Sequence, residues 1–459
     1  MDSDPVPFGD EFHHRRLLLN QRMNMPPNHR RSSRGSVFIV VLVVCLGLVS
    51  LTVVFGHSMM MAYRGEETDL AGRQAEQAIQ GAARYAEYLI ASGTAPGVLP
   101  DPTTYQSEAV TVGDATFWFI GEPASTGSTT PTASADTPSF GLVDEASKLN
   151  LNTASETMLE NLPTMTPTLA QAIVQWRTAA TSTSTASTAA TAASATTKGG
   201  PFESLQELAL VNDQNGGDPT VLYGDDTNLN HVLDANENHG GGQFNPGIFE
   251  YTTVFSREPN TLSDGTARVN VTQNPAALRA LLQTTLGQSQ GTQVAQRLAT
   301  GAPVRSVLEF YIRSGITAAQ LDQLTPQLTM KNGPYAVGLI NVNTASATVL
   351  QCIPGITQNQ AAQIVAARST PSTNLAWLVP ILGNAAAIQA GPYLTTQSYQ
   401  VTADVAAVGR FGRGYRRTLF VIDSSNGPPQ IIYQRNMAAL GWALGPTALQ
   451  TLGMNKVLQ

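Results

Sequence analysis

One stretch of the sequence carries the residue types and spacing of a metal-binding loop. Residues 226–237 read DTNLNHVLDANE, with oxygen-bearing side chains at alternate positions. Counted from the first residue, such side chains stand where an EF-hand calcium loop has its ligands, and position 7 of that loop supplies a backbone carbonyl. Hard oxygen donors favour Ca²⁺. The predicted ligands are the side chains of Asp226, Asn228, Asn230, Asp234 and Glu237 and the carbonyl of Val232.

His231 departs from the pattern of this loop. It stands where the EF-hand normally has the glycine of its sharp turn. Histidine tolerates a positive φ better than most residues, so the loop can still close at some cost in affinity. The alternative is an Asn/Asp-rich turn that binds no metal. We expect a structural Ca²⁺ site.

A second stretch resembles a motif of nucleophilic catalysis. Residues 287–291 read GQSQG and match the G-x-S-x-G string of α/β-hydrolases around Ser289. That motif requires a strand before the turn, whereas the preceding LRALLQTTL has a helical pattern. Beyond the apolar N-terminal segment the only histidines are His231 and His239. We therefore expect a chance match and a protein that is not an enzyme.

The overall composition limits the classes of partner. Of 459 residues only 13% are charged, and the net charge is −7. Proteins that grip nucleic-acid phosphates over a broad surface usually carry a basic excess, so no nucleic-acid partner is expected. Cys45 and Cys352 are too few for a disulfide framework.

The N-terminal region predicts a membrane segment. Residues 1–35 form a polar leader with basic residues near its end, and residues 36–63 carry no formal charge apart from His57. The apolar run Val37–Phe55 is long enough to span a bilayer as a helix. The arginines before it place the leader in the cytoplasm and the bulk of the chain outside. A secretory signal peptide and a plain anchor are the alternatives.

The middle of the chain contains an internal repeat. Residues 147–177 and 338–368 align without a gap at an offset of 191, and 13 of 31 positions are identical. Each copy predicts a helix, a tight turn and a second helix, and resembles the helix-hairpin-helix motif. One interpretation is DNA-backbone binding and the other is a packing module. Thr164 and Thr357 replace hairpin glycines, and the second helices offer Gln and Ala where phosphate-binding cations would be needed, which favours packing.

The remaining segments complete an α+β architecture. Strands are predicted at Ala115–Gly121, Ser398–Gly409, Tyr415–Asp423 and Pro429–Arg435. The predicted fold is a long N-terminal transmembrane helix, a pilin-like α/β domain with an antiparallel sheet, and a large, mostly α-helical insertion containing the two repeats. Arg410, Arg413, Arg416 and Arg417 form either a solvated turn or a partner contact. The expected parts are a leader (1–35), a transmembrane helix (36–63), the first part of the pilin-like domain (64–143), the insertion (144–390, with a low-complexity surface run at 178–197), the terminal strands (391–435) and a tail (436–459).

These features resemble a known family. The sequence Arg34-Gly35-Ser36-Val37-Phe38, a basic leader ending in glycine before an apolar helix, is similar to a type IV prepilin processing site. Most pilins have Glu at the fifth mature position, and this chain has Val40. That absence, the paired NLNTAS/NVNTAS repeats and the acidic GDDTNLN loop resemble the K family of minor pseudopilins of type II secretion systems.

The resemblance carries further expectations. It implies that prepilin peptidase cuts between Gly35 and Ser36 and methylates the new N-terminus. It implies a non-catalytic tip subunit of a periplasmic pseudopilus that assembles with other minor pseudopilins and the secretion assembly. The chain would cross the inner membrane once, with its bulk in the periplasm. The alternative is an external, membrane-anchored DNA receptor of the competence type.

Overall fold

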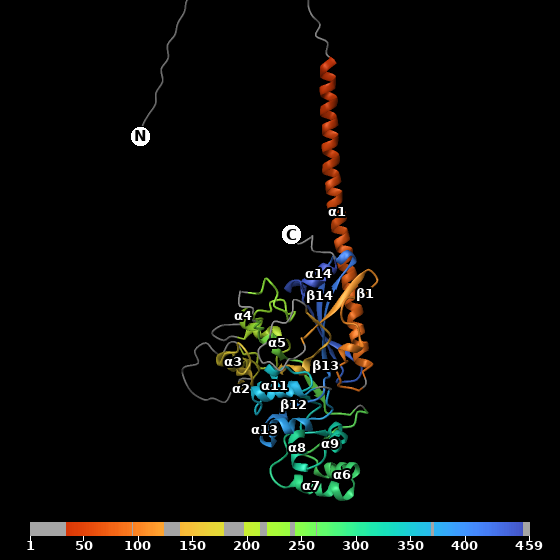
Figure 1. Cartoon of the computed structure of the whole chain (residues 1–459). Helices are drawn as coiled ribbons and strands as arrows, with labels where there is room; N and C mark the ends of the chain where they lie inside the picture. The colour runs from red at the N-terminus through yellow and green to blue at the C-terminus, as the bar shows by residue number, and fades with distance from the viewer. Residues whose placement is uncertain are drawn as a thin grey trace, which may run out of the picture. The chain divides into compact units, whose positions relative to one another are not determined.

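The structure, a computed structural model of the chain, describes residues 34–93, 95–123, 138–178, 197–211, 218–238, 244–262, 264–368 and 371–452 (Figure 1). The chain divides into two compact units, Met1–Gly65 and Glu66–Gln459. The predicted leader, apart from Arg34 and Gly35, and most of the low-complexity run at 178–197 lie outside the described residues.

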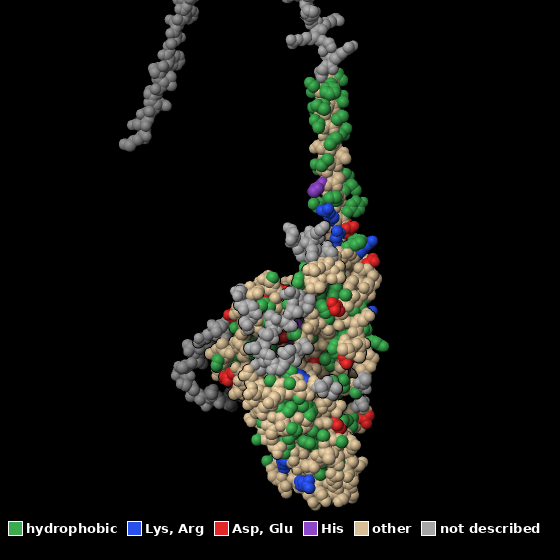
Figure 2. Space-filling view, in the orientation of Figure 1, with side chains coloured by type: hydrophobic (Ala, Val, Ile, Leu, Met, Phe, Trp, Pro, Cys, Tyr) green, Lys and Arg blue, Asp and Glu red, His purple; other side chains and the backbone are tan. Residues whose placement is uncertain are grey.

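The first unit consists, in its described part, of the beginning of helix α1 (Arg34–Ala91). Large hydrophobic side chains from Val37 to Phe55 are exposed on every side of this helix. Its most apolar window has a mean hydropathy of 3.2, and the helix is long and apolar enough to cross a membrane. Figure 2 shows hydrophobic side chains along this part of the helix. A helix that is apolar all round and unburied by protein is the pattern of a membrane span.

The second unit contains an antiparallel sheet packed on the rest of α1. The strand order is β1 (Val110–Val112), β2 (Ala115–Gly121), β13 (Gln400–Val408), β14 (Arg416–Asp423) and β15 (Gln430–Asn436), with β3 (Ser139–Phe140) beside β2 and β4 (Val143–Asp144) beside β13. Alanines at helical spacing let the helix approach the sheet closely. The shared core includes Ala75, Ala78, Ile79, Ala82 and Ala86 of α1 with Phe117, Phe119, Val405 and Phe420 of the sheet.

The four predicted strands are confirmed, as is the α+β fold. β2 has the predicted bounds, and β13, β14 and β15 lie within two residues of theirs. All nine residues of β13 are buried, because the strand lies between β2 and β14 and is covered on both faces. The second face is covered by the segment after β15, which contains α14 (Gly445–Thr451) and places Ala443 and Leu444 against Trp118 and Ile120.

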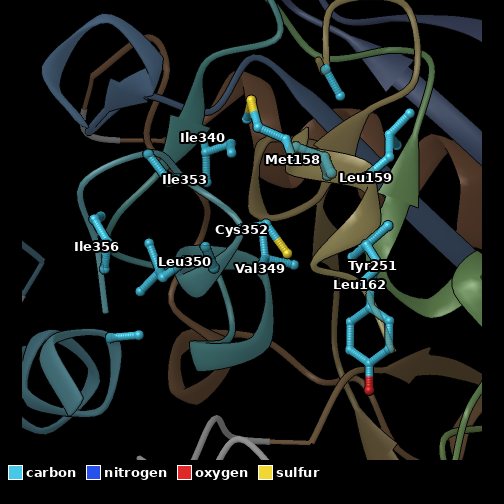
Figure 3. Close-up of a cluster of buried hydrophobic side chains, with 14 of the residues drawn as sticks. Met158, Leu159, Leu162, Tyr251, Ile340, Val349, Leu350, Cys352, Ile353 and Ile356 are labelled. Carbon is cyan, nitrogen blue, oxygen red and sulfur yellow. The ribbon is translucent and has the colours of Figure 1, made fainter. Parts of the chain in front are cut away.

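A mostly helical region lies between β4 and β13 in the chain. The two predicted repeats fold as α2 (Glu156–Glu160) with α3 (Pro167–Arg177) and α10 (Ala347–Gln351) with α11 (Gln358–Ala367). Ser155 and Ser346, rather than the preceding asparagines, cap the first helix of each copy. Figure 3 shows that the copies share one core, in which Met158 and Leu159 lie near Val349 and Cys352. Other helices of the region are α4 (Pro219–Leu222), α5 (Ile248–Tyr251), α6 (Pro275–Leu286), α7 (Gln288–Ala299), α8 (Val307–Ser314), α9 (Ala318–Leu324), α12 (Val379–Leu382) and α13 (Asn384–Ala390).

The structure adds a third segment, residues 269–329, that is built like the two repeats. Three two-residue parallel pairs each join an asparagine to a threonine: β5 (Leu149–Asn150) with β6 (Thr252–Thr253), β8 (Val269–Asn270) with β9 (Leu328–Thr329), and β11 (Ile340–Asn341) with β12 (Leu394–Thr395). In each pair the asparagine side-chain oxygen accepts the N–H two residues later, at 2.8 to 3.0 Å. This third segment begins in the sequence RVNVTQNPAALRALL, which is weakly similar to the two repeats.

Candidate metal centre

The predicted calcium loop lies between α4 and α5, and a backbone contact holds its start in place. Gly224, just before the loop, has φ +61°, and a Cβ there would lie 2.2 Å from the carbonyl oxygen of Asn245. Only glycine allows this approach of two backbone segments. The loop therefore starts from a position set by the chain that follows it.

The first and last carboxylates close the loop on itself. Asp226 is fully buried and accepts the backbone N–H groups of Asn230 and His231 at 3.0 and 2.8 Å. Glu237, also buried, accepts the N–H of Thr227 at 2.9 Å and that of Asp234 at 3.2 Å. The backbone of the loop is thus wound around both carboxylates, which is the arrangement that a chelating loop requires.

The middle ligands converge on one point. The carboxylate oxygen Oδ2 of Asp234 accepts the side-chain amides of Asn228 and Asn230 at 2.7 and 3.0 Å. The Oδ1 atom of Asn228 is buried and has no hydrogen-bond partner among the described residues. Orphaned buried acceptors are rare, and amide oxygen and nitrogen exchange places by a half-turn of the side chain. Such a turn would direct the Asn228 oxygen at Asp234 and would give up the bond that the Asn228 amide donates to the carbonyl of Trp442 at 3.1 Å. An all-oxygen set also requires Asn230 to turn, because its nitrogen faces Asp234 as well.

His231 takes the conformation predicted for it. Its φ is +63°, the left-handed value that the glycine position demands. Its ring faces α5, where Nδ1 lies 2.6 Å from Oε2 of Glu250. Burial alone would lower the pKa of His231, but the facing carboxylate of Glu250, with Asp226 and Glu122, raises it to about 9. The histidine is therefore a cation that neutralises Glu250.

Glu250 brings a second group of ligand types to the same place. Ligand atoms of Asp226, His231 and Glu250 lie within 4.8 Å of one another and could hold a metal ion. This group shares only Asp226 with the predicted loop ligands. No spacing in the sequence indicated Glu250, which follows the loop by 13 residues and lies in α5. This group includes a histidine nitrogen that already pairs with Glu250, whereas the ligands predicted for the loop are all oxygen atoms.

An arginine of the sheet holds the loop from outside. Arg417 of β14 is fully buried and donates to the backbone carbonyls of Asn228 and Leu229, the latter at 2.6 Å. The same guanidinium forms an ion pair with Asp404 of β13 at 2.6 Å. Arg417 therefore does not belong to a solvated turn, as the sequence had suggested for four arginines together. It connects the loop to the central strands.

At the end of its second helix, each helix-hairpin-helix copy has an arginine that makes hydrogen bonds inside the protein. Arg177 and Arg368, at equivalent positions in the two copies, each donate to two backbone carbonyls of their own copy: Leu151 and Ala154, and Val342 and Ala345. Burial lowers the pKa of both, that of Arg368 to about 10. These two guanidinium groups fasten the second helix of each copy to the loop before the first.

The two hairpin turns differ in exposure. Thr164 of the first turn is exposed, with φ +61°. Gly355 of the second has φ +91°, and a Cβ there would lie 3.0 Å from Cβ of Gln389 and 3.1 Å from the carbonyl oxygen of Ala386. The second hairpin therefore packs against α13.

A comparison with known protein families identifies the same two repeats. A family model described as a helix-hairpin-helix motif matches residues 144–187 and 336–376. The chain carries two helix-hairpin-helix motifs. No curated protein matches it in sequence. Among solved structures, a chain in the GspK-GspI-GspJ complex of the type 2 secretion system from enterotoxigenic Escherichia coli matches with 12% identity and a TM-score of 0.16, over 36% of this chain and 70% of that one.

Proposed function

We propose that this protein is a non-catalytic minor pseudopilin that forms the tip of the periplasmic pseudopilus of a type II secretion system. The observation that carries the proposal is the combination of an apolar helix with the sheet packed on its continuation, in a chain whose helix follows a basic leader ending in Gly35. Val40 in place of the usual glutamate supports a tip position, because a tip subunit has no neighbour above whose N-terminus must be neutralised.

Processing of the leader is part of this proposal. Prepilin peptidase would cut between Gly35 and Ser36, leaving a chain that is anchored in the inner membrane by residues 36–63. The partners would be other minor pseudopilins. A tagged full-length chain, extracted from membranes of a host with a type II secretion system, should copurify with pilin-like subunits. Recovery without any of them would contradict the proposal.

The loop at 226–237 would bind one structural Ca²⁺ ion. Asp226, Asn228, Asn230, Asp234 and Glu237 would supply side-chain oxygens and Val232 a carbonyl. The buried, unpartnered oxygen of Asn228 supports this ligand set. Calcium would fasten the helical region to the sheet, because the loop is already bonded to Arg417.

A DNA receptor remains the second candidate, because the helix-hairpin-helix match favours it. The internal use of Arg177 and Arg368 and the packing of the second hairpin on α13 speak against it. A gel-shift experiment with duplex DNA at low salt separates the two, since backbone binding is strongest there. We expect no shift.

We also propose that the G-x-S-x-G string has no catalytic role. Ser289 is exposed in the first turn of α7, and helix α6, not a strand, leads into Gly287. The nucleophile elbow of α/β-hydrolases depends on a strand at this place. Ser289→Ala should therefore be silent in any ester or peptide hydrolysis assay.

A further inference from the structure

The turn between β13 and β14 holds an exposed aromatic residue in a strained conformation. Phe411 has φ +60° and ψ 26°, the left-handed region, and its side chain is 67% exposed. Glycine adopts this conformation freely, and Gly412 and Gly414 do so in the same turn, with φ of 70° and 68°. A bulky residue at the remaining left-handed position gains nothing from burial within this chain, so the stability of the fold does not explain it.

The backbone of the turn lies against helix α1. A Cβ at Gly409 would lie 2.1 Å from the carbonyl oxygen of Ala71, and one at Gly414 would lie 2.3 Å from the N atom of Gly72. The N–H of Arg410 also donates to Oε1 of Gln74 at 3.1 Å. The turn is therefore held on the helix, while Arg410, Phe411 and Arg413 remain exposed.

Three exposed arginines lie in or next to the same turn as Phe411. Arg410, Arg413 and Arg416 are exposed, and the guanidinium of Arg410 lies 4.6 Å from the ring centroid of Phe411. Arg413 forms an exposed ion pair with Glu67 at 2.6 Å. The stretch 409–417 contains four arginines and no acidic residue, in a chain with a net charge of −7. An aromatic ring stacked with cationic groups suits the interface between lipid headgroups and acyl chains.

The chain tethers this turn to the end of the apolar segment. Glu67, which pairs with Arg413, follows Tyr63, the last residue of the uncharged segment, by four positions. At ~1.5 Å per helical residue this is about 6 Å of helix, well within the reach of an arginine side chain and a lipid headgroup together. The length of chain between Tyr63 and Glu67 therefore limits how far Arg413 can lie from the end of the uncharged segment.

We propose that the β13–β14 turn is a membrane-surface contact, with Phe411 inserted at the headgroup boundary and Arg410, Arg413 and Arg416 bound to anionic phospholipid headgroups. This inference rests on the proposed insertion of residues 36–63 in the membrane. The contact fixes the rotation of the chain about its anchor and thereby the direction in which the second unit faces before assembly.

The test uses the full chain in lipid nanodiscs with Cys45→Ser, because Cys45 is exposed whereas Cys352 is buried. Phe411→Cys carries a bimane label, and Ser289→Cys on α7, remote from β14 in Figure 1, is the matched exposed control. In discs of phosphatidylcholine and phosphatidylglycerol, we expect nitroxide lipids to quench the label at position 411 and aqueous iodide to quench the label at 289. Changing Arg410, Arg413 and Arg416 to Gln should reduce the lipid quenching several-fold, as should discs of phosphatidylcholine alone.

The possible failures are distinguishable. A chain that inserts in the disc but leaves position 411 as open to iodide as position 289 overturns this inference and leaves the proposed anchor intact. A chain that does not enter the disc overturns both. Protection of position 411 that requires added pilin-like proteins would replace the lipid contact with a protein contact.

Discussion

At the scale of single residues, the loop at 226–237 combines two demands on His231. The residue takes the left-handed conformation that a chelating loop needs and neutralises the buried Glu250 of α5. The sequence predicted the first role from spacing alone. It could not predict the second, because the contact depends on a helix whose position is set by packing.

Substitutions in the loop separate these roles. Asp226→Ala and Glu237→Ala should abolish the rise in melting temperature that calcium produces, because a ligand that binds only the folded state stabilises it by mass action. His231→Gly should enlarge the calcium response by removing the strained turn. The same change should destabilise the calcium-free protein by about 3 kcal/mol, since it leaves the Glu250 carboxylate buried without its partner.

Melting curves with calcium and with a chelator measure both effects of His231→Gly. The double variant His231→Gly/Glu250→Gln is the control, because it also removes the unpaired charge and should recover most of the lost stability. If neither calorimetry nor melting of the unmutated protein responds to calcium, the metal assignment is wrong.

Arg417 gives a second prediction at this scale. Lysine cannot bond two carbonyls and a carboxylate at once with the planar fork of a guanidinium. Arg417→Lys should therefore lower the free energy of unfolding by about 3 kcal/mol and weaken calcium binding. Chemical denaturation and calorimetry measure the two quantities. The adjacent and exposed Arg416→Lys is the matched control and should change stability by less than ~0.5 kcal/mol. An equal effect of both substitutions would refute the positioning role of Arg417.

At the scale of elements, the repeats and strands show which parts of the fold can be predicted from the sequence. Strands such as β2 were predicted because apolar and β-branched residues concentrate between turn residues. The two-residue parallel pairs could not be predicted, since each joins short segments that lie 54 to 103 residues apart in the chain. The third segment has only weak sequence similarity to the two repeats, because it has a short turn at Gly287 where the repeats have a Pro-containing hairpin.

Contacts shared by the two copies also locate an insertion. Asn152 bonds both backbone groups of Phe202, and Asn343 bonds those of Ser372 in the same way. The two spans are 50 and 29 residues, so the first copy contains 21 additional residues. The low-complexity run at 178–197 accounts for nearly all of them.

The hairpins allow a reciprocal test of the repeat. Thr164→Gly should raise the free energy of unfolding by about 1 kcal/mol, because a β-branched residue is strained at positive φ and glycine is not. The equivalent exchange in the second copy, Gly355→Thr, should lower it by 2 kcal/mol or more, since its side chain would meet Gln389 and Ala386. Thermal or chemical denaturation measures both. Changes of the same sign would contradict the predicted hairpin geometry.

The contact between β4 and the second copy should make stability depend on pH. Asp144 is buried and accepts four hydrogen bonds, from the side chains of Asn341, Thr344 and Ser398 and the N–H of Ala146. Burial nevertheless raises the pKa of Asp144 to about 6. A raised pKa in the folded state means that the stability contribution is complete below pH ~4 and is lost as the pH rises through ~6.

Asp144→Asn should remove this dependence. The difference in unfolding free energy between the unmutated protein and the variant should fall by about 3 kcal/mol from pH 4 to pH 7. Denaturation at a series of pH values in calcium-free buffer provides the measurement. A difference that stays constant with pH would show that the pKa of Asp144 is the same in the folded and unfolded states.

At the scale of the whole molecule, the chain has three parts with different properties. The apolar part of α1 suits a bilayer, the sheet covers the continuation of that helix, and the helical region carries the repeats and the loop at 226–237. The sequence predicted this order because each part has its own pattern: an uncharged run, alternating strands and a gapless repeat. It did not predict how the parts are fastened, because buried polar residues such as Arg417 and Asp144 act across long distances in the chain.

The central claim is that the chain is a processed pilin-type assembly subunit, and the identity of its mature N-terminus tests this most directly. The full chain should be produced in a host with prepilin peptidase and its N-terminal peptide determined by mass spectrometry. The account predicts Ser36 as the first residue, carrying a methyl group, and a Gly35→Leu variant that remains uncut. Retention of Met1 in the unmutated chain, or a cut after Phe55 of the apolar segment, would contradict it.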